Sequence, residues 1–504
     1  MSCTVLSGTL VGVDAHLVRV EVDLLNRLPT VVIVGLPGGA VRESADRVRS
    51  ALQHAGFDFP RKRVVVNLAP ADLRKTGTGF DLPIAVGILA ASEQVPSEVL
   101  GETAFYGELS LDGQLRRVRG ALSVALMARS QGFTRLVLPA DCAAEAAVVD
   151  GLDVLAAHDL EQVATWLRDG TGLARADAPT APPSRNTHDL AEVRGQHEAR
   201  RALEVAAAGG HNLLMVGSPG CGKSMLAARL PSILPALTFE EAIDITRVHS
   251  VAGLLDTGQG LVAQRPFRAP HHSVTAAGMI GNAALRPGEV SLAHHGVLFL
   301  DEIAEFQRSV LELLRGPLED RRLLLTRANG SVEFPADVSL VAAANPCPCG
   351  YLGHPTRPCV CAPGAIERYR QRLSGPLLDR IDLHVWVDPV SPGALARAHP
   401  GEASAAVRAR VEAARERQRT RYAHQGIQCN AQLQGDQVRA AAQPTAEALA
   451  VLERTLAKLG LSARAWARIL KVARTVADLD GDARVDAPHV LEALAWRAHP
   501  GTTR

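Results

Sequence analysis

The chain has 504 residues, more than one ordinary hydrophobic core can organise, so we expect roughly three domains. Hydrophobic residues make up 47% of the sequence and charged residues 21%, a balance that excludes a largely disordered protein. The formal net charge of +1 excludes a basic field over the whole surface, so any contact with nucleic acid must come from a local patch.

The first residues and the cysteines predict the cellular compartment of the protein. Residues 1–16 lack a charged segment followed by a long apolar run, and no stretch reaches the ~20 apolar residues that cross a bilayer. Four of the eight cysteines crowd between 347 and 361, which indicates a metal site in a reducing compartment rather than a disulfide framework. We therefore expect a cytoplasmic protein with no membrane partner.

In chain order, residues 1–169 alternate β-type runs with helical stretches and predict an α/β domain. Its expected strands and helices include 30–34, 63–67 and 135–139, and 44–54 and 121–131, respectively. Residues 170–187 are rich in Gly, Ala and Pro and predict a linker. A second α/β domain is expected at 188–390. Helical spacing at 407–421 and 446–459 then predicts an all-helical carboxyl-terminal domain at 391–504.

A glycine-rich loop follows the apolar run 212–216 and precedes a helical stretch at 225–230. A strand, a loop and a helix in this order favour phosphate binding over a chance turn, because the glycines let backbone N–H groups face phosphate oxygens. Lys223 is expected to reach the β and γ phosphates, and the Ser224 hydroxyl to ligate Mg²⁺. The predicted nucleotide-binding residues are Gly217, Ser218, Pro219, Gly220, Cys221, Gly222, Lys223 and Ser224.

Two acidic residues, Asp301 and Glu302, directly follow the apolar run 296–300. Alone, such a pair is usually a solvated helix start. Beside a phosphate-binding loop it suits hydrolysis, with Asp301 in the magnesium shell and Glu302 polarising the attacking water.

Asn345 and Arg380 are further candidates for the same site. Asn345 follows the predicted strand 338–344, where its amide would orient water or sense the γ-phosphate; a turn asparagine before Pro346 is the plainer alternative. Arg380 stands in the segment 377–382 where an arginine finger is expected. Such a finger often comes from a neighbouring subunit, which predicts a closed ring.

Six segments together resemble the ComM/YifB family of magnesium-chelatase-like AAA+ proteins over nearly the whole chain. They are DLAEVRGQ at 189–196, GSPGCGKS at 217–224, RPFRAPHHS at 265–273, GVLFLDE at 296–302, AAANPCPCG at 342–350 and RLSGPLLDRID at 372–382. The resemblance implies a Lon-protease-like (ribosomal S5-type) first domain, an AAA+ core and a helical lid. It also implies a hexameric motor that uses ATP and Mg²⁺ to promote branch migration of DNA in natural transformation. Arg464 is nominated as a second sensor of the nucleotide, with a plain surface arginine as the alternative.

The similarity to the Lon protease domain is carried by segments 66–72, 79–83 and 107–111. Lon-type cleavage needs a serine and a lysine, whereas this sequence offers Asp81 and about Val124 at the corresponding places. Because neither is a nucleophile or a base of the required kind, we expect no proteolysis.

Two basic features are candidates for contact with DNA. Segment 321–334 predicts a hairpin turning at Asn329-Gly330 that resembles the pre-sensor hairpin of helicase-like AAA+ rings. Arg327 would meet phosphates there; a solvated edge-strand charge is the equal alternative. The helix at 407–421 carries six arginines, although such runs are more often solvated faces with internal ion pairs.

The crowded cysteines Cys347, Cys349, Cys359 and Cys361 would supply four thiolates to one tetrahedral Zn²⁺, with unliganded cysteines as the alternative. The histidine pairs at 271–272 and 294–295 lack comparable further ligands, and we interpret them as structural.

Three classes of function remain: a DNA-remodelling motor, a chelatase-type ATPase that inserts a metal with partner subunits, and a Lon-like protease. The missing dyad excludes the protease. The Lon-like first domain and the lack of an Asp-x-Ser-x-Ser motif disfavour the chelatase. We therefore predict an ATPase that acts as a ring helicase on DNA.

Overall fold

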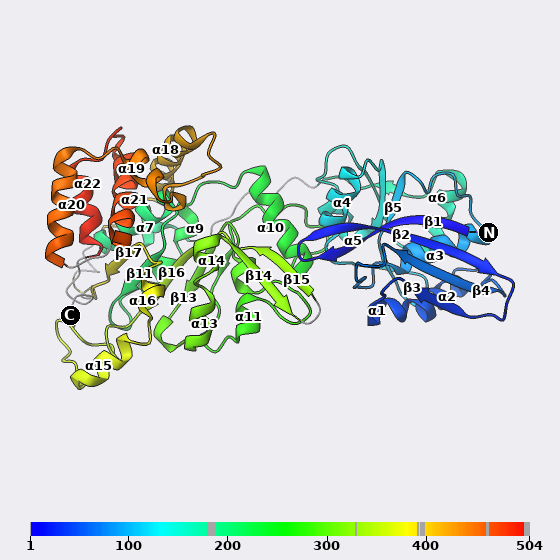
Figure 1. The fold of residues 1–504 in the computed structure, drawn as a ribbon, viewed down its shortest axis with the longest axis horizontal. Helices are drawn as coiled ribbons and strands as arrows, with labels where there is room; N and C mark the ends of the chain where they lie inside the picture. Colours follow the sequence, from blue (N-terminus) through cyan, green and yellow to red (C-terminus); the bar gives the residue numbers. More distant parts are fainter. Residues whose placement is uncertain are drawn as a thin grey trace.

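A computed structural model of the chain describes residues 2–178, 188–327, 330–390, 393, 399–459 and 463–497, with only the backbone at 459 and 463. Parts of four expectations lie outside these residues: 179–187 of the linker expected at 170–187, Asn329 of the hairpin turn, the segment before Arg464, and 391–392, 394–398 and 498–504 of the carboxyl-terminal domain. The described residues form two bodies that lie end to end, with the amino-terminal body at one end and the carboxyl-terminal helices at the other (Figure 1).

The amino-terminal body is built on one mixed eight-stranded sheet in the order β10-β9-β8-β5-β1-β2-β4-β3. Residues alternate between buried and exposed or half-buried along β2 and β4, as expected where one face of a sheet covers a core. Every residue of α3 is buried, so this helix lies inside the body rather than on its surface.

The strands of this body are β1 Ser2–Val11, β2 Asp14–Leu25, β3 Val31–Val34, β4 Arg63–Ala69, β5 Thr103–Phe105, β8 Arg135–Pro139, β9 Asp153–Ala157 and β10 Ala174–Arg175, with β6 Glu108–Leu109 and β7 Leu115–Arg116 as a separate pair. Its helices are α1 Gly39–Arg42, α2 Ser44–His54, α3 Asp81–Ala91, α4 Ala121–Ser130, α5 Ala140–Ala146 and α6 Leu160–Asp169.

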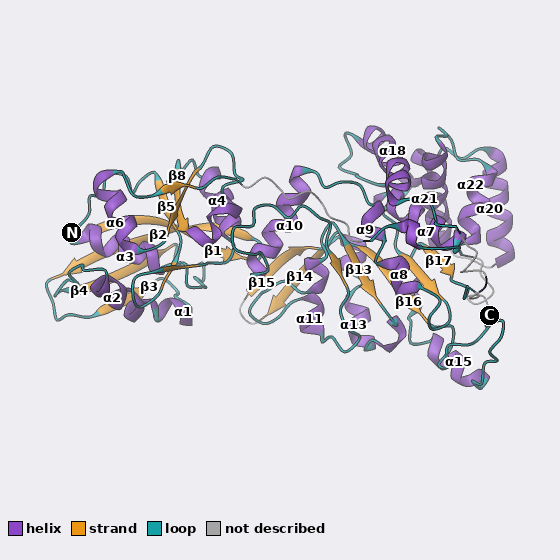
Figure 2. Ribbon diagram, turned by 180° about the vertical axis from the view of Figure 1, so that it is seen from behind, coloured by secondary structure: helices purple, strands orange, loops and turns teal. Residues whose placement is uncertain are grey.

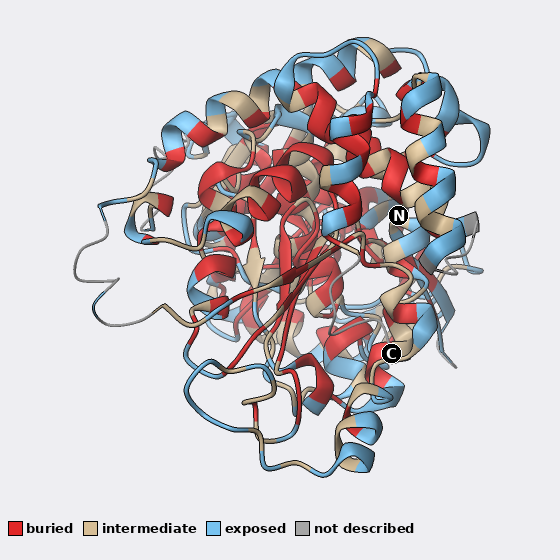
Figure 3. Ribbon diagram, turned by 90° about the vertical axis from the view of Figure 1, so that its left-hand side faces the viewer, coloured by how far each residue is buried: buried red, intermediate tan, exposed pale blue. Residues whose placement is uncertain are grey.

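The second body contains a five-stranded parallel sheet in the order β12-β13-β16-β11-β17. Its strands are short and apolar because helices cover both faces. Figure 3 shows the buried strands at the centre and helices with one buried and one exposed side around them. The strands are β11 Leu213–Val216, β12 Phe267–Arg268, β13 Val297–Leu300, β16 Ser339–Ala344 and β17 Leu383–Trp386.

Helices and a hairpin surround this sheet (Figure 2). The helical elements are η1 Leu190–Glu192, α7 His197–Gly209, α8 Lys223–Ala227, α9 Leu230–Ile233, α10 Phe239–Ala252, α11 Ala276–Ile280, α12 Glu289–Leu292, η2 Ile303–Glu305, α13 Arg308–Leu313, α14 Pro317–Asp320, α15 Pro363–Arg370 and α16 Gly375–Leu378. The hairpin is β14 Arg322–Arg327 and β15 Gly330–Pro335.

After β17 the described elements are helical, and they share one apolar cluster with α7, β11 and β17. Val411 of α18, Ile469 of α21 and Val490 of α22 belong to the same cluster as Leu213. The carboxyl-terminal helices pack on α7 and α9, and α7 in turn packs on β11 and β17 of the parallel sheet. The carboxyl-terminal helical elements are α18 Ser404–Tyr422, η3 Asn430–Gln432, α19 Asp436–Ala442, α20 Ala446–Leu459, α21 Ala463–Asp480 and α22 Ala487–Ala495.

The two bodies meet at the β1–β2 turn, which packs against the hairpin, and at α10, where the Ser250 hydroxyl donates to Glu145 of α5. Val13 is buried in the apolar cluster that contains Leu325 and Val332 of the hairpin. Arg247 of α10 donates a hydrogen bond to the Val13 carbonyl and pairs with Asp14. This contact is apolar at its centre and charged at its edge.

The helix expected at 225–230 is wrong in its bounds. The first helix begins at Lys223 and ends at Ala227, and a second begins at Leu230. Pro231 lies in the first turn of the second helix and has no N–H for the carbonyl of Ala227, so one continuous helix cannot run through it.

Among the described helices, none combines the length and the apolar character that a bilayer crossing needs. The cytoplasmic location stays a prediction.

Candidate nucleotide-binding site

The phosphate-binding loop leaves the end of β11, and two of its glycines are required by geometry. A Cβ on Gly217 would lie 2.3 Å from the carbonyl oxygen of Val387, so no larger residue fits between the two backbones. Gly222 has φ of +101° immediately before α8, a conformation that side chains rarely adopt. The loop can therefore turn tightly enough to present its N–H groups.

Lys223 is buried and its ammonium group lies inside the loop. Its Nζ donates hydrogen bonds to the carbonyl oxygens of Gly217, at 2.7 Å, and Ser218, at 3.0 Å. It also donates to Oδ1 of Asn345 at 3.3 Å. Three oxygen acceptors thus hold the ammonium group of Lys223 in place. Phosphate oxygens of a bound nucleotide would be acceptors of the same kind.

Asp301 and Ser224 meet although 77 positions separate them. The Ser224 hydroxyl donates to the Asp301 carboxylate at 2.6 Å. Glu302 is exposed, and its backbone has φ of +50°, a left-handed conformation that is uncommon for a residue with a side chain. Its N–H donates to Asp301 at 3.0 Å, which fixes the turn that carries the second acid.

The sheet order explains why these groups converge. β16 lies between β11 and β13, with Ala344 beside Val216 and Ala342 beside Leu300. The loop, the acidic pair and Asn345 each follow one of these three parallel strands, so they emerge at the same edge of the sheet. This is the edge at which open α/β sheets bind ligands.

Arg380 and Arg464 do not join this group within one chain. Arg380 pairs with Glu319 and donates to the Pro376 carbonyl at 2.8 Å. Arg464 is exposed near the start of α21. In the described residues, neither arginine hydrogen-bonds to the phosphate loop.

Three family models match this chain. The model of magnesium chelatase, subunit ChlI, matches residues 189–395; that of subunit ChlI of Mg-chelatase matches 20–142; and that of the ChlI C-terminal region matches 401–497. Over 503 residues the chain is 45% identical to competence protein ComM of Haemophilus influenzae, covering 98% of this chain and 97% of that protein. It is 44% identical to YifB of Escherichia coli over 490 residues, or 97% and 95% of the two chains.

The chain belongs to the ComM/YifB family of magnesium-chelatase-like proteins. An uncharacterized protein of Mycobacterium tuberculosis is 45% identical over 492 residues, 96% of each chain. A weaker similarity, 25% over 134 residues, relates a quarter of this chain to Lon protease of Clostridioides difficile. Similarity to the family thus extends over both bodies, whereas similarity to Lon is partial.

In this family member, Asp81 is buried in a hydrogen-bonded network. Its carboxylate accepts from Nε of Arg47 at 2.8 Å, from the Ser44 hydroxyl and from the Leu109 N–H. Burial raises the pKa of Asp81, and the hydrogen bonds of Arg47 and Ser44 oppose this rise. Val124 is fully buried in α4. The two positions expected to correspond to the Lon dyad thus hold a buried, hydrogen-bonded carboxylate and a buried apolar side chain; the correspondence itself stays a prediction.

The hairpin has one buried and one exposed face. β14 and β15 pair antiparallel, from Arg322 opposite Pro335 to Arg327 opposite Gly330. Leu323 and Phe334 face the core, whereas Arg327 is exposed at the end of the pair and donates only to the Thr326 carbonyl among the described residues. The expected hairpin is present, and its exposed end carries the predicted arginine.

The arginines of α18 mostly bind other parts of the protein. Arg415 and Arg417 donate to the carbonyl oxygens of Ala207 and Asp478, at 2.9 and 2.6 Å respectively. Arg410 pairs with Glu204 and Glu402, Arg421 with Asp478, and Arg408 donates to the Ser232 carbonyl. Most of these arginines are therefore engaged by other parts of the chain, Arg419 pairs with Glu416 within the helix, and DNA contact by this helix stays untested.

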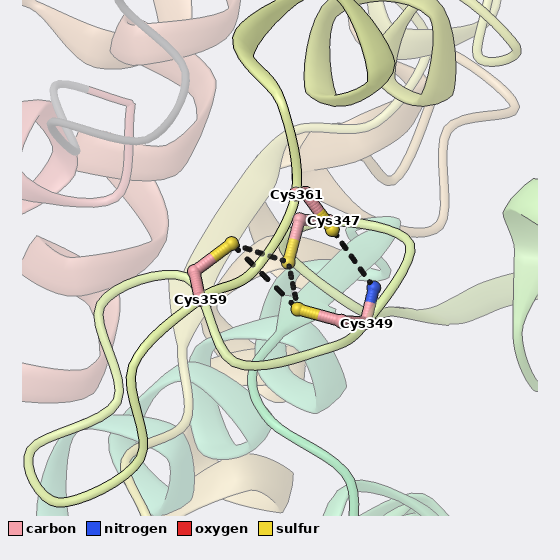
Figure 4. Close-up of side chains that lie close together, drawn as sticks. All are labelled: Cys347, Cys349, Cys359 and Cys361. Carbon is pink, nitrogen blue, oxygen red and sulfur yellow. Dashed lines mark hydrogen bonds between the residues drawn. The ribbon is translucent and has the colours of Figure 1, made fainter.

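The four cysteines lie together in the loop between β16 and α15 (Figure 4). The Sγ atoms of Cys347, Cys349 and Cys359 are separated by 3.4 to 3.6 Å, and the N–H of Cys349 donates to Sγ of Cys361 at 3.3 Å. Backbone N–H groups of Tyr351 and Val360 lower the pKa of the Cys349 thiol to about 6. All four are free cysteines whose sulfurs lie within 4.8 Å of one another, so the set fits a single metal ion.

The sequence did not predict two residues: Asp244, which lies beside the histidine pair at 294–295, and Tyr369 in α15. Asp244 lies within 4.8 Å of the ligand atoms of His294 and His295, whose rings are 3.8 Å apart, and no fourth ligand joins them in the described residues. Burial and the neighbouring His295 lower the pKa of His294 to about 4, so this pair remains structural in our interpretation. Tyr369 of α15 is buried, and burial and Glu305 raise its pKa to about 12. No local pattern could have located Asp244 or Tyr369, since both approach through the fold.

Proposed function

We propose that the protein is an AAA+ ATPase that binds ATP with Mg²⁺. The convergence of Lys223, Ser224, Asp301 and Asn345 at one sheet edge carries the proposal. Mg²⁺ held between Ser224 and Asp301 would neutralise charge on the phosphates. Lys223 binds the β and γ phosphates, and Asn345, which contacts Lys223, orients the γ-phosphate or the attacking water.

Glu302 is the proposed base that polarises the water. Its side chain is exposed, and its turn is held by the N–H donated to Asp301. An exposed carboxylate beside the magnesium ligand can accept a proton from a water molecule in line with the γ-phosphate. In this proposal Asp301 serves the magnesium ion and Glu302 serves the attacking water.

We further propose four segments: a Lon-like S5-fold domain without protease activity at 1–169, a linker at 170–187 whose first part forms β10 on the sheet of that domain, the AAA+ core at 188–390 and a helical lid at 391–504. The fold and the partial similarity to Lon protease support the first assignment. The match of the chelatase models to 189–395 and 401–497 supports the last two.

Arg380 and Arg464 complete the proposed site in a ring, most simply a hexamer. Neither arginine hydrogen-bonds to the phosphate loop of its own chain in the described residues, and hydrolysis needs positive charge beyond Lys223 at the transferred phosphate. A homo-oligomer in which Arg380 reaches the neighbouring nucleotide satisfies that requirement.

The proposed work of this ATPase is DNA remodelling, as a ring helicase that promotes branch migration. The 45% identity to a competence protein supports this choice, as does Arg327 at the exposed end of the hairpin. Single-stranded or branched DNA is the proposed partner. A chelatase-type motor that acts with metal-insertion subunits is the second candidate, favoured by the chelatase family models.

ATP hydrolysis with and without DNA tests the proposal, together with migration of a synthetic four-way junction. DNA should stimulate hydrolysis, and Lys223→Ala should lower turnover by at least ~10²-fold because the phosphate charge is left unmatched. Lys458→Ala, a surface change on α20, is the matched control. Hydrolysis without any effect of DNA would favour the chelatase-type motor, and equal rates for Lys223→Ala and the wild type would refute the ATPase.

A further inference from the structure

The segment from Asn345 to Ala362 crosses the nucleotide-binding edge without forming a helix or a strand. Its backbone is therefore not held by the ladder hydrogen bonds that fix the rest of the sheet edge. Cys347 is fully buried and the other three cysteines are half-buried, so their thiols face one another inside the loop. The cluster is the feature that joins the two ends of this segment.

The spacing of the sulfurs matches a metal site better than a disulfide. Four sulfurs ~2.3 Å from a tetrahedral Zn²⁺ lie about 3.8 Å from one another. Three sulfurs here are 3.4 to 3.6 Å apart and the fourth is within 4.8 Å of them, whereas a disulfide joins sulfurs at about 2.05 Å. Four free thiols that converge within fifteen residues thus form a closed tetrahedral donor set, as in structural zinc sites.

The loop packs on the phosphate loop, and the helix that follows it contacts the segments that carry Asn345 and the acidic pair. A Cβ on Gly350 would lie 2.5 Å from Pro219, so the cysteine loop packs directly on the phosphate loop. At the other end, Cys361 precedes α15. The backbone N–H of Asn345 donates a hydrogen bond to the hydroxyl oxygen of Tyr369 in this helix. Arg372, just after α15, donates to the carboxylate of Glu305 at 2.8 Å and to the Ala304 carbonyl at 3.3 Å.

We infer that one structural Zn²⁺ is bound by Cys347, Cys349, Cys359 and Cys361. This ion fixes Asn345 and α15 against the phosphate loop and against the acidic turn, which is the turn that carries Asp301 and Glu302. The catalytic part of this inference rests on the proposed ATPase function; the metal site does not. Zn²⁺ acts here at a distance from the phosphates. It holds the elements that position the reacting groups, and it takes no part in the reaction.

Losing the ion should affect turnover more than nucleotide binding. The glycines and Lys223 remain on β11 and α8, so ATP still has its main contacts. Asn345 and the acidic turn lose their brace, and a misplacement of about 1 Å costs up to ~10²-fold in rate. We expect kcat to fall by roughly tenfold or more while the Kd for a fluorescent ATP analogue changes less than about threefold.

Metal analysis of the full-length protein, purified under reducing conditions, is the first test. We expect one Zn²⁺ per chain, and none after Cys359→Ser combined with Cys361→Ser. Cys3→Ser, in the first strand of the other body, is the matched control and should retain the ion. Cobalt replacement adds a second readout, because a Co²⁺ ion with four thiolates has a characteristic visible absorption.

Each outcome bears on a separate part of the inference. A protein that contains no zinc and binds neither Zn²⁺ nor Co²⁺ overturns the site. Zinc that is lost from the double variant with kcat unchanged overturns the positioning role and leaves the site standing. A folded wild-type protein that binds zinc but hydrolyses no ATP refutes the proposed function instead. Circular dichroism of the double variant separates local loosening from unfolding.

Discussion

The replacement Asp382→Asn tests how the carboxyl-terminal helices are anchored to the parallel sheet. Asp382 stands just before β17, and its carboxylate lies 3.0 Å from Nδ1 of His211. Nε2 of the same histidine lies 2.8 Å from the hydroxyl of Thr475 on α21. Arg468 of α21 also approaches the carboxylate, at 3.9 Å. The negative charge therefore connects the sheet with a helix of the carboxyl-terminal part.

The size of the effect follows from the pKa of this carboxyl group. Burial alone would raise the pKa of Asp382, but His211, Lys471 and Arg468 lower it from 3.8 to about 2. A depressed carboxyl pKa stabilises the fold above pH 3.8, and the stabilisation is lost as the pH falls through 2. The shift corresponds to about 2 kcal/mol at pH 7 and about 1 kcal/mol at pH 3. The amide introduced by Asp382→Asn would keep the shape of the side chain and remove its charge.

Thermal unfolding of the full-length protein measures this difference. Asp382→Asn should lower the midpoint at pH 7 by about 4 °C, at the lower end of the range for large domains. The deficit should be about half as large at pH 3. Asp379→Asn is the matched control, since Asp379 is 43% exposed and lies 3.9 Å from Arg468. Equal effects of the two variants, or a deficit at pH 3 as large as at pH 7, would refute the assignment of the stabilising charge to Asp382.

Three further predictions concern the proposed site and the contact between the two bodies. Glu302→Gln should bind a fluorescent ATP analogue like the wild type but turn over ATP ~10² to 10⁴ times more slowly; an equal loss of binding would contradict its role as a base. Arg380→Ala should be inactive alone and regain activity when mixed with Lys223→Ala, because mixed rings contain interfaces with both residues intact; no recovery would argue against a shared site. Arg247→Ala removes the partner of Asp14 and should speed tryptic separation of the two bodies, whereas unchanged cleavage would mean that the packing of Val13 is sufficient.

Features encoded by neighbouring residues were predicted well. The short apolar runs before the phosphate loop and before Asp301 are strands within one residue of the expected bounds. The helix at 44–54 and the hairpin strands of 321–334 also lie where spacing and turn residues placed them. Hydrophobic periodicity and turn-forming residues depend only on neighbouring positions, so they can be identified in a single sequence.

The contacts that the sequence did not predict join residues that are far apart along the chain. The arginines of α18 are charged in the sequence, but the carbonyl oxygens and carboxylates that they bind come from α7, α9, α21 and Glu402. Tyr369 meets the backbone of Asn345 across 24 positions of the sequence. Asp244 reaches the histidine pair from α10, 50 positions earlier than His294. None of these pairs shares a local pattern, so spacing alone could not connect them.

The burial of Val13 beneath the hairpin restricts how the two bodies can move. The side chain belongs to the same apolar cluster as Leu325 and Val332, so the hairpin cannot tilt without either dragging the β1–β2 turn along or exposing that cluster to water. A force applied at the exposed end near Arg327 would therefore be felt in the amino-terminal body. The hairpin and the β1–β2 turn are therefore expected to move as one unit.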